Sequence, residues 1–436
     1  MEDESKTMFA MNVLRHLHRL RRNQWLATAE LEELQAKKLR SMIKFAYENV
    51  EFYHRRFDAL GLKPSDIKTV DDLQKLPVTT RLDVQKNFPD GLLARGVSIE
   101  NCTRHCSSGS TGMPVVVCGD AKTESYRAAL FGRPFFECGL RLTDKMVRIT
   151  NSPQSRIKRL YERFGLLRKI NFAPSESVES NLKQLTNYRP DAIFGHSSYI
   201  YLLAKKLAEQ QRYGSIMPRL AFTTAEVITP YMRKFIGSAF GAEVFDLYGC
   251  VEVERLAWEC KEHAGYHMDI DSQVIEFVAD NEHVAANESG QILVTCLYNY
   301  AMPLIRYDLG DVGVPSDEKC PCGRGLPLMK NVEGRINDFV QLPDGRTISP
   351  MTFLCLDGIK GISQFRVTQT KKDKILVEIV LDEHDTTETV HKSHELIEDI
   401  VGSSIHVEVM TKNRLSSEKS GKFRNVRSFL NNDKLY

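Results

Sequence analysis

One segment of this chain combines glycines with hydroxyl side chains in a pattern suited to binding phosphate. The segment Ser107-Ser108-Gly109-Ser110-Thr111-Gly112 leads through Met113 and Pro114 into an apolar run of valines. Glycines let the backbone approach a phosphate and turn its N–H groups toward it, and hydroxyls add donors. It is not a Walker A loop, because its glycines are three residues apart and no Gly-Lys-Ser/Thr follows. Residues 107–112 are therefore a candidate phosphate-binding loop, with a plain surface turn as the alternative.

Two short Cys/His pairs could together bind one metal ion. Cys260 and His263 are separated by two residues, and Cys320 and Cys322 by one. Thiolates and imidazole in a tetrahedral set are typical of zinc, and a site filled by four protein ligands is structural. We therefore predict a structural Zn²⁺ held by Cys260, His263, Cys320 and Cys322. His267 competes for the histidine position because it lies on the same predicted hairpin, and unrelated loop thiols are the alternative to a metal site.

Hydrophobic periodicity indicates the elements that position the polar segments. Strands alternate with helices between about residues 185 and 250, with predicted strands 190–195, 218–224 and 242–248 and predicted helices 199–210 and 230–240. Thr229 and Pro230 suit the start of the second helix and Gly241 suits its end. A βαβαβ order implies a parallel sheet covered by helices.

Three polar segments fall at the carboxyl ends of these strands, where parallel sheets usually bind ligands. They are GHSS at 195–198, TTAE at 223–226 and YGCVE at 248–252. We expect them to converge on one crevice. The neighbouring acids Glu226, Glu254 and Asp308 are interpreted as surface charges.

The two ends of the chain have a different texture. The first fifty residues lack proline and repeat apolar residues at helical spacings, so they are predicted to be helical. After about residue 335, short alternating strands at 364–370, 374–381 and 406–410 accompany a charged helix at 391–401. This part is predicted to be an α+β domain, with a boundary near Gly334-Arg335.

Composition excludes several classes of protein. The 436 residues are 42% hydrophobic and 27% charged, which predicts two domains with large cores. The chain has 59 lysines and arginines and 57 aspartates and glutamates, so its net charge is 59 − 57 = +2. A charge this small disfavours a general nucleic-acid binder. No stretch has the roughly 18 apolar residues of a membrane span, and the acidic start differs from a secretory leader. Ten cysteines are too sparse for a disulfide scaffold, so we expect a reducing cytoplasm.

Five motifs occur in the order found in adenylate-forming enzymes, a superfamily of acyl- and aryl-CoA synthetases and adenylation domains. They are SSGSTGMP at 107–114, YGCVE at 248–252, RYDLGD at 306–311, GRINDF at 334–339 and SGKF at 420–423. The N-terminal segment LEELQAKKLRSMIKFAYENVEFY and the segment CPCGRGLP resemble the phenylacetate-CoA ligase family more specifically. The segments ECKEHAGYH and LPDGRTISP resemble its branch linked to capsular-polysaccharide biosynthesis.

The resemblance implies an α/β fold. A large N-terminal adenylate-forming domain, 1–334, would have parallel or mixed sheets covered by helices, and a small mobile α+β domain, 335–436, would carry Lys422. It also implies activation of a carboxylic acid by Mg²⁺ and ATP to an acyl-adenylate and pyrophosphate, followed by acyl transfer to a thiol such as CoA.

The resemblance also assigns roles to residues. Ser107, Ser108, Gly109, Ser110, Thr111 and Gly112 would bind the β- and γ-phosphates. Tyr248 would stack on adenine, Glu252 would carry Mg²⁺, and Asp311 would accept hydrogen bonds from the ribose hydroxyls. Arg335 would reach the ribose or α-phosphate, and Lys422 would stabilise charge at the α-phosphorus. The acyl pocket would include Phe135, His196, Ser197, Tyr199 and Ala225.

Two departures from the superfamily concern the second half-reaction. The resemblance makes Arg335 the hinge arginine between the two domains, and Asn337 stands two residues later, where many members have Asp or Lys. Residues 341–345 replace a glycine-rich stretch expected after the hinge in many CoA ligases. An amide ligase that transfers the acyl group to an amine is therefore an alternative acceptor chemistry. A non-catalytic nucleotide-binding or scaffold protein is a second alternative, disfavoured by the joint presence of Glu252, Asp311, Arg335 and Lys422. The sequence names neither the acid nor the oligomeric state, and is compatible with a homodimer.

Overall fold

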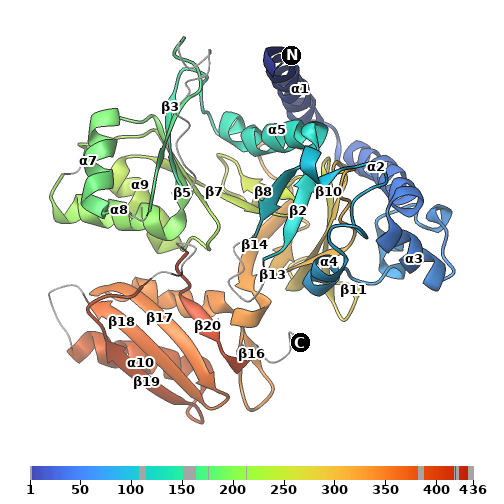
Figure 1. Ribbon diagram of the computed structural model, residues 1–436. Coiled ribbons are helices and arrows are strands. Elements are labelled where there is room, and N and C mark those ends of the chain that lie inside the picture. Colours follow the sequence, from blue (N-terminus) through green and yellow to red (C-terminus); the bar gives the residue numbers. More distant parts are fainter. Residues whose placement is uncertain are drawn as a thin grey trace. The chain divides into compact units, whose positions relative to one another are not determined.

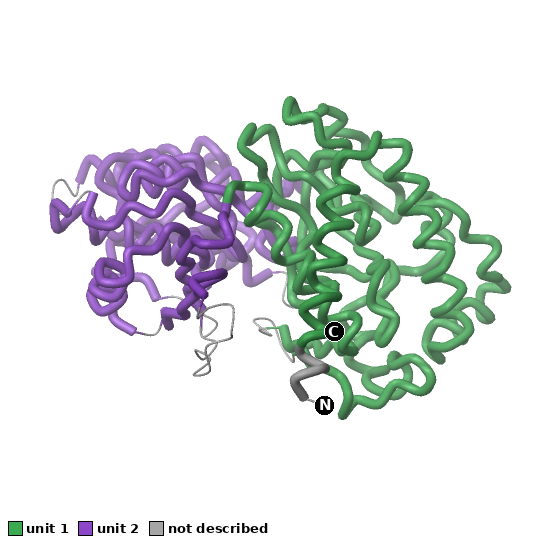
Figure 2. The backbone as a smooth tube through the Cα atoms, turned by 90° about the horizontal axis from the view of Figure 1, so that it is seen from above, with its two compact units in different colours: residues 1–139, 247–332 green, residues 140–246, 333–436 purple. Residues whose placement is uncertain are grey.

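A computed structural model describes residues 2–107, 114–150, 164–174, 176–212, 214–381, 387–416, 418 and 422–430. The chain forms two compact units, each built from two separate stretches (Figure 2). Unit 1 comprises residues 1–139 and 247–332, and unit 2 comprises residues 140–246 and 333–436. Two of the crossings between them fall inside strands, namely β7 (Glu243–Cys250) and β14 (Leu328–Arg335).

The division of the chain into units adds a feature that the sequence did not indicate. One break, between residues 332 and 333, lies close to the predicted boundary at Gly334-Arg335. Residues 140–246, however, group with the C-terminal part of the chain. The functional division into 1–334 and 335–436 stays a prediction.

Unit 1 begins with the predicted helical region, which is broken into separate helices. Its helices are α1 (Glu2–Asn23), α2 (Thr28–Asn49), α3 (Glu51–Ala59), α4 (Arg81–Asn87) and α5 (Ala121–Glu137). The break before α2 falls at residues 24–27, where the Ala27 amide donates to Glu30 Oε2 and so caps the second helix. Helix α2 buries a stripe of side chains that includes Leu39 and Met42.

The strands of unit 1 form a hairpin and a sheet. The hairpin pairs β1 (Thr103–Cys106) with β2 (Val116–Gly119) in antiparallel register. The sheet has the order β11-β10-β12-β13-β14-β9-β8-β7. Its further strands are β8 (Glu254–Glu259), β9 (Tyr266–Met268), β10 (Gln273–Ala279), β11 (Glu282–His283), β12 (Gly290–Cys296) and β13 (Tyr307–Pro315). Figure 1 labels β7, β8, β10, β11, β13 and β14 among these strands. The pairings β7–β8, β8–β9, β9–β14 and β10–β12–β13 are antiparallel.

Unit 2 contains the predicted alternation of strands and helices. Its first part consists of β3 (Lys145–Ile149), β4 (Arg168–Phe172), α7 (Val178–Tyr188), β5 (Ala192–His196), α8 (Ser197–Glu209), β6 (Leu220–Thr224) and α9 (Pro230–Phe240). Strands β4, β3, β5 and β6 are parallel neighbours. As predicted, Thr229 caps α9 by accepting from the Met232 amide, and Gly241 ends it with a φ of +64°.

The C-terminal part of unit 2 is the predicted α+β domain. It contains β15 (Val340–Gln341), β16 (Thr347–Ile348), β17 (Ile362–Lys371), β18 (Lys374–Leu381), α10 (Thr387–Val401), β19 (His406–Thr411) and β20 (Val426–Ser428). The order β19-β18-β17-β20 forms one sheet. Its core packs side chains of this sheet against α10 and the 3₁₀ segment Pro350–Gly358. Among the helices that the structure describes, none has the length and apolar character needed to span a bilayer.

Candidate active site

Tyr248 and Asp311, two residues with predicted roles at the nucleotide, are in direct contact in unit 1. Tyr248 lies near the end of β7, and its hydroxyl donates a hydrogen bond to Asp311 Oδ2 on β13 at 2.8 Å. Asp311 is buried, with 8% of its surface exposed. Gly249, next along β7, is needed sterically, because a Cβ there would lie 2.3 Å from the Glu254 carbonyl oxygen. The tight β7–β8 turn therefore presents Tyr248 toward β13.

Glu252, the predicted magnesium ligand, lies in the same turn and also faces β13. The Tyr307 hydroxyl donates to Glu252 Oε1 at 3.4 Å. Burial, followed by the negative charge of Glu252, raises the pKa of Tyr307, so its hydroxyl keeps its proton and acts as a donor. Strand β13 thus contacts both Tyr248 and Glu252, the residue predicted to stack on adenine and the residue predicted to carry Mg²⁺.

Helix α5 supplies a brace for this turn that the sequence did not reveal. Arg127, 5% exposed, donates through Nη2 to the Val251 carbonyl oxygen at 3.0 Å and to Glu254 Oε2 at 3.0 Å, and through Nη1 to the Glu252 carbonyl oxygen at 3.4 Å. The interpretation of Glu254 as a surface charge is therefore wrong, because its carboxylate is paired with a buried arginine. The Tyr298 hydroxyl holds the Val253 carbonyl oxygen at 2.7 Å. The backbone around Glu252 is thus fixed from two sides.

The candidate phosphate loop is described only at its edges. Ser107 and Val115 exchange hydrogen bonds, with both the Ser107 amide and the Ser107 hydroxyl paired to the Val115 backbone at 2.9 Å. Ser108, Gly109, Ser110, Thr111 and Gly112 lie outside the described residues. Arg81, the first residue of α4, donates from Nη2 to Ser107 Oγ at 3.2 Å. This arginine is a cation in contact with the first residue of the candidate loop, and no sequence motif indicated it.

The predicted acyl-pocket residues divide between the units. Phe135 is in unit 1, where its ring packs against Phe131 at 5.0 Å between centroids. His196, Ser197, Tyr199 and Ala225 are in unit 2. The Tyr199 ring belongs to the hydrophobic core of unit 2, and its hydroxyl accepts from Asn181 Nδ2 at 2.7 Å. Among the described residues, His196 Nδ1 is buried without a hydrogen-bond partner, so it is a polar group suited to meet a substrate.

Glu226 ties the end of β6 to two other segments of unit 2. Its Oε2 accepts from the Ser198 amide at 2.8 Å, and its Oε1 accepts from the Phe423 amide at 2.7 Å. Phe423 directly follows the predicted catalytic Lys422. The interpretation of Glu226 as a surface charge is therefore wrong, since both carboxylate oxygens are occupied. Asp308 lies on β13 and is half-buried, and its Oδ1 accepts from the Gly310 amide at 2.7 Å.

The predicted hinge also contacts the segment that carries Lys422. Gly334 has a φ of +118°, a conformation that glycine adopts readily. Arg335 is exposed at the end of β14. Asp338, 6% exposed, accepts from Arg424 Nη1 at 2.8 Å. The hinge and the Lys422 segment therefore belong to one connected part of unit 2.

Sequence comparison decides the family to which this site belongs. No family model matches the chain. The phenylacetate-coenzyme A ligase of Escherichia coli (strain K12) is 31% identical over 337 residues, which are 71% of this chain and 72% of that relative. The chain belongs to the phenylacetate-CoA ligase family. The family assignment made from the five motifs is confirmed.

Two further similarities extend over more of this family member. Protein CapK of Staphylococcus aureus is 24% identical over 412 residues, 91% of this chain and 88% of that protein, which fits the capsule-linked branch. A solved 2-hydroxyisobutyryl-CoA ligase in its postadenylation state, bound to the acyl-adenylate R3-HIB-AMP, has a TM-score of 0.79 at 20% identity. That alignment covers 93% of this chain and 90% of the other. The expected fold is confirmed.

A second cluster in unit 1 of this phenylacetate-CoA ligase family member could hold a metal ion. Cys260, His267, Cys320 and Cys322 each offer one ligand atom, and these atoms all lie within 4.8 Å of one another. Two sulfur atoms, those of Cys260 and Cys320, are 3.6 Å apart, and Cys322 Sγ is 3.3 Å from His267 Nε2. The donor set fits a tetrahedral structural zinc.

The choice of His263 as the histidine ligand is wrong in the structure, which brings His267 into the cluster. His267 is on β9 and is paired with Trp258 of β8 and Leu328 of β14, so the strand register points it at the loop that carries the cysteines. His263 lies in the preceding turn, where its Nδ1 is 3.7 Å from Glu259 Oε2. Burial lowers the pKa of His267 to about 4, so the imidazole is neutral, as a metal ligand must be.

The thiols of this cluster have unequal acidity. Burial raises the pKa of Cys260, and it raises that of Cys320 to about 12. For Cys322, burial acts in the same direction, but hydrogen bonds from the Arg324 amide and guanidinium outweigh it and lower the pKa. A divalent ion would deprotonate all three thiols on binding.

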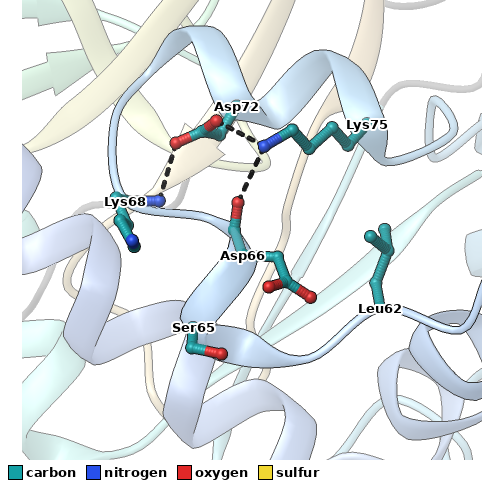
Figure 3. Close-up of a pocket in the computed structure, with 6 residues that line it drawn as sticks. All are labelled: Leu62, Ser65, Asp66, Lys68, Asp72 and Lys75. Carbon is teal, nitrogen blue, oxygen red and sulfur yellow. Dashed lines mark hydrogen bonds and ion pairs between the residues drawn. The ribbon is translucent and has the colours of Figure 1, made fainter.

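A cavity of about 370 Å³ elsewhere in unit 1 does not compete with these sites. Leu62, Ser65, Asp66, Lys68, Asp72 and Lys75 line it (Figure 3). Lys75 Nζ lies 2.6 Å from Asp72 Oδ1, which pairs these two charges, and 3.0 Å from the Asp66 carbonyl oxygen. Asp72 Oδ2 accepts from the Lys68 amide at 2.9 Å. The cavity contains no residue with a predicted role, and we assign it no function.

Proposed function

We propose that this chain is an ATP-dependent, AMP-forming acid–thiol ligase. A carboxylate oxygen of the acid attacks the α-phosphorus of ATP and pyrophosphate leaves; the thiol of CoA then attacks the acyl carbon and AMP leaves. The observation that carries the proposal is the pairing of Tyr248 with Asp311, with Glu252 in the same turn, in a chain of the phenylacetate-CoA ligase family. These residue types suit a nucleotide and its metal ion.

Each residue of the site has a role in this proposal. Glu252 would hold Mg²⁺, an ion that takes one or two carboxylates and completes its shell with substrate phosphates and water. Asp311 would bind the ribose hydroxyls and Tyr248 the adenine. Residues 107–112, joined by Arg81, would bind the outer phosphates. Arg335 would contact the ribose or α-phosphate, and Lys422 would stabilise the charge that develops at the α-phosphorus.

The acid is proposed to be an aryl or other small organic acid. The proposed pocket residues in unit 2 are His196, Ser197, Tyr199 and Ala225. Phe135, in unit 1, stays a prediction from the sequence. His196 is the best supported of them, because its buried Nδ1 has no partner among the described residues. The hydroxyl of Tyr199 is already paired with Asn181, so its contribution is expected to be packing.

CoA is the proposed acyl acceptor. The relatives at about 30% identity are named as coenzyme A ligases, and the compared 2-hydroxyisobutyryl-CoA ligase has also been solved with an acyl-adenylate and CoA. An amine acceptor and a homodimer remain predictions from the sequence alone. A reducing cytoplasm is proposed as the location, because the described cysteines are free and three of them, Cys260, Cys320 and Cys322, cluster with His267.

We also propose one structural Zn²⁺ bound by Cys260, His267, Cys320 and Cys322. The support is the clustering of three sulfur atoms and one imidazole nitrogen within 4.8 Å. The ion would join the loop before β14 to the β8–β9 hairpin, which lies apart in sequence from that loop.

The experiment that tests the activity is a pyrophosphate-release assay over a panel of carboxylic acids, with CoA, with an amine, and with neither. Pyrophosphate release that depends on an acid, with thioester formed only when CoA is present, is the expected result. An amide product would assign the alternative acceptor. Failure of every acid to release pyrophosphate from protein that binds ATP would contradict the proposed activity.

A further inference from the structure

Glu226 is held between two segments that are far apart in sequence. It follows β6, and its two carboxylate oxygens accept from the Ser198 amide at 2.8 Å and the Phe423 amide at 2.7 Å. Ser198 is in the first turn of α8, whose N-terminus carries a partial positive charge that favours a carboxylate. The Ser197 hydroxyl also donates to the Glu226 carbonyl oxygen at 3.2 Å. The contacts with Ser197 and Ser198 therefore hold Glu226 at the start of α8, independently of its contact with Phe423.

Only a carboxylate can make both contacts. An ionised glutamate is acceptor-only and offers two oxygens, whereas a glutamine in the same position offers one oxygen and one NH₂ group. The amides of Ser198 and Phe423 are therefore bound by the two separate acceptor oxygens of the Glu226 carboxylate. Hydrogen bonds to a charged acceptor are also stronger than neutral ones.

The contact has a consequence for the neighbouring lysine. Phe423 directly follows Lys422, and a bond to the Phe423 amide fixes the backbone from which Lys422 extends. A second contact between the same parts of unit 2 joins the Thr229 hydroxyl to Asp357 Oδ2 at 2.7 Å. Because of this second contact, losing the Glu226 bond would loosen the Lys422 segment without detaching it.

We propose that Glu226 is a positioning residue that holds the Lys422 segment for adenylate formation and releases the Phe423 amide before acyl transfer. The proposal rests on the proposed function, in which Lys422 acts only in the first half-reaction. Glu226 contacts the backbone beside the catalytic lysine and is not itself placed at the reacting atoms.

The first test measures the contact itself, without substrate. Hydrogen exchange of the Phe423 amide should become at least about tenfold faster in Glu226→Ala, since a hydrogen bond to a charged group has been removed. Arg219→Gln is the matched control, because it removes an ion pair to Asp144 in the same unit and touches neither segment. Unchanged exchange in Glu226→Ala would overturn the proposal whatever the enzyme's activity.

The second test separates the half-reactions by single-turnover kinetics. Adenylate formation should fall about tenfold in Glu226→Ala and by less in Glu226→Gln, which keeps the size of the side chain and one acceptor. Transfer from presynthesised acyl-adenylate to CoA should stay at the parental rate or rise. Equal losses in both halves, or unchanged adenylation, would overturn the proposal. A parent protein that forms no adenylate with any acid would instead contradict the proposed function.

Discussion

The hydroxyl of Tyr248 donates a hydrogen bond to Asp311 Oδ2 across 2.8 Å, which joins the end of β7 to β13 within unit 1. Both residues come from motifs that the sequence made conspicuous, and the fold brings them into contact although β7 and β13 are not neighbours in the sheet. The bond leaves Tyr248 oriented by the same carboxylate that is proposed to bind ribose. Their roles can therefore be separated by substitution.

Asp311→Ala should weaken ATP binding at least tenfold. A carboxylate that accepts two ribose hydroxyls makes charge-assisted hydrogen bonds, each worth about 1.5–3 kcal/mol. Tyr248→Phe keeps the ring and loses only the hydroxyl, so its loss of affinity should be smaller. Calorimetric titration with ATP measures both variants, and identical binding by Asp311→Ala and the parent would remove Asp311 from the site.

Lys422→Ala should slow adenylate formation by roughly 10²-fold or more, the loss typical of one preorganised charge-stabilising group. Transfer from supplied acyl-adenylate should continue at nearly the parental rate. Single-turnover assays measure each half-reaction, and equal losses of both rates in Lys422→Ala would contradict the assignment of Lys422 to adenylate formation alone.

Asn337→Pro should spare adenylate formation and slow acyl transfer. Residue 337 lies in a short 3₁₀ turn, Ile336–Asp338, that tolerates a fixed φ, while a hinge that must change φ does not. The same single-turnover assays measure both rates in this variant.

Arg127→Met should raise the Mg²⁺ concentration needed for half-maximal adenylation by about tenfold. The guanidinium holds the carbonyl oxygens of Val251 and Glu252, and its loss frees the backbone that aims the Glu252 carboxylate. Arg21→Gln serves as the control, since it removes an ion pair to Glu137 on the same helix. An Mg²⁺ dependence that is the same in Arg127→Met and Arg21→Gln would show that Arg127 only stabilises the fold.

Freshly purified protein should contain one equivalent of zinc, and His267→Gln should lose it while His263→Gln keeps it. A Cys320→Ser/Cys322→Ser variant should also lose the metal. Because the ion would link two loops, each loss should lower the melting temperature before it alters catalysis. Elemental analysis with thermal unfolding measures both effects, and well under one equivalent in the parent would rule out the site.

Asp269 should make the stability of this protein depend on pH near neutrality. Burial raises the pKa of Asp269 to about 7, against an unfolded value near 3.8. The positive charge of Arg133, whose Nη2 lies 2.5 Å from Asp269 Oδ1, opposes this rise. The folded state then binds the proton more tightly, so this contribution to stability is complete below about pH 3.8 and is lost as pH rises through about 7. Urea unfolding of the parent and Asp269→Asn between pH 5 and pH 8 should show a weaker pH dependence in the variant. Parallel curves would mean that Asp269 stays ionised in the folded protein.

The local sequence pattern was sufficient to predict the alternating helices and strands, and the order of the motifs was sufficient to assign the family. The alternating region gave β5, α8, β6, α9 and β7 near their observed positions, because strand and helix periods differ and Thr229, Pro230 and Gly241 mark the ends of α9 by their own backbone preferences. The family followed from ordered motifs, which need no knowledge of packing.

Side-chain partners were decided by tertiary structure. Spacing favoured His263 as a zinc ligand, yet the pairing of β9 with β8 and β14 selects His267, because strand register sets which side chain faces a distant loop. Arg127, Glu254 and Glu226 resemble ordinary surface charges in sequence. Their hydrogen-bond partners lie on other elements, and only the folded structure brings these partners into reach. The contact with a carbonyl oxygen or a backbone amide offsets the cost of burying the charge. The sequence by itself determined which chemical groups are present and in which order, and the tertiary structure decided which of them meet.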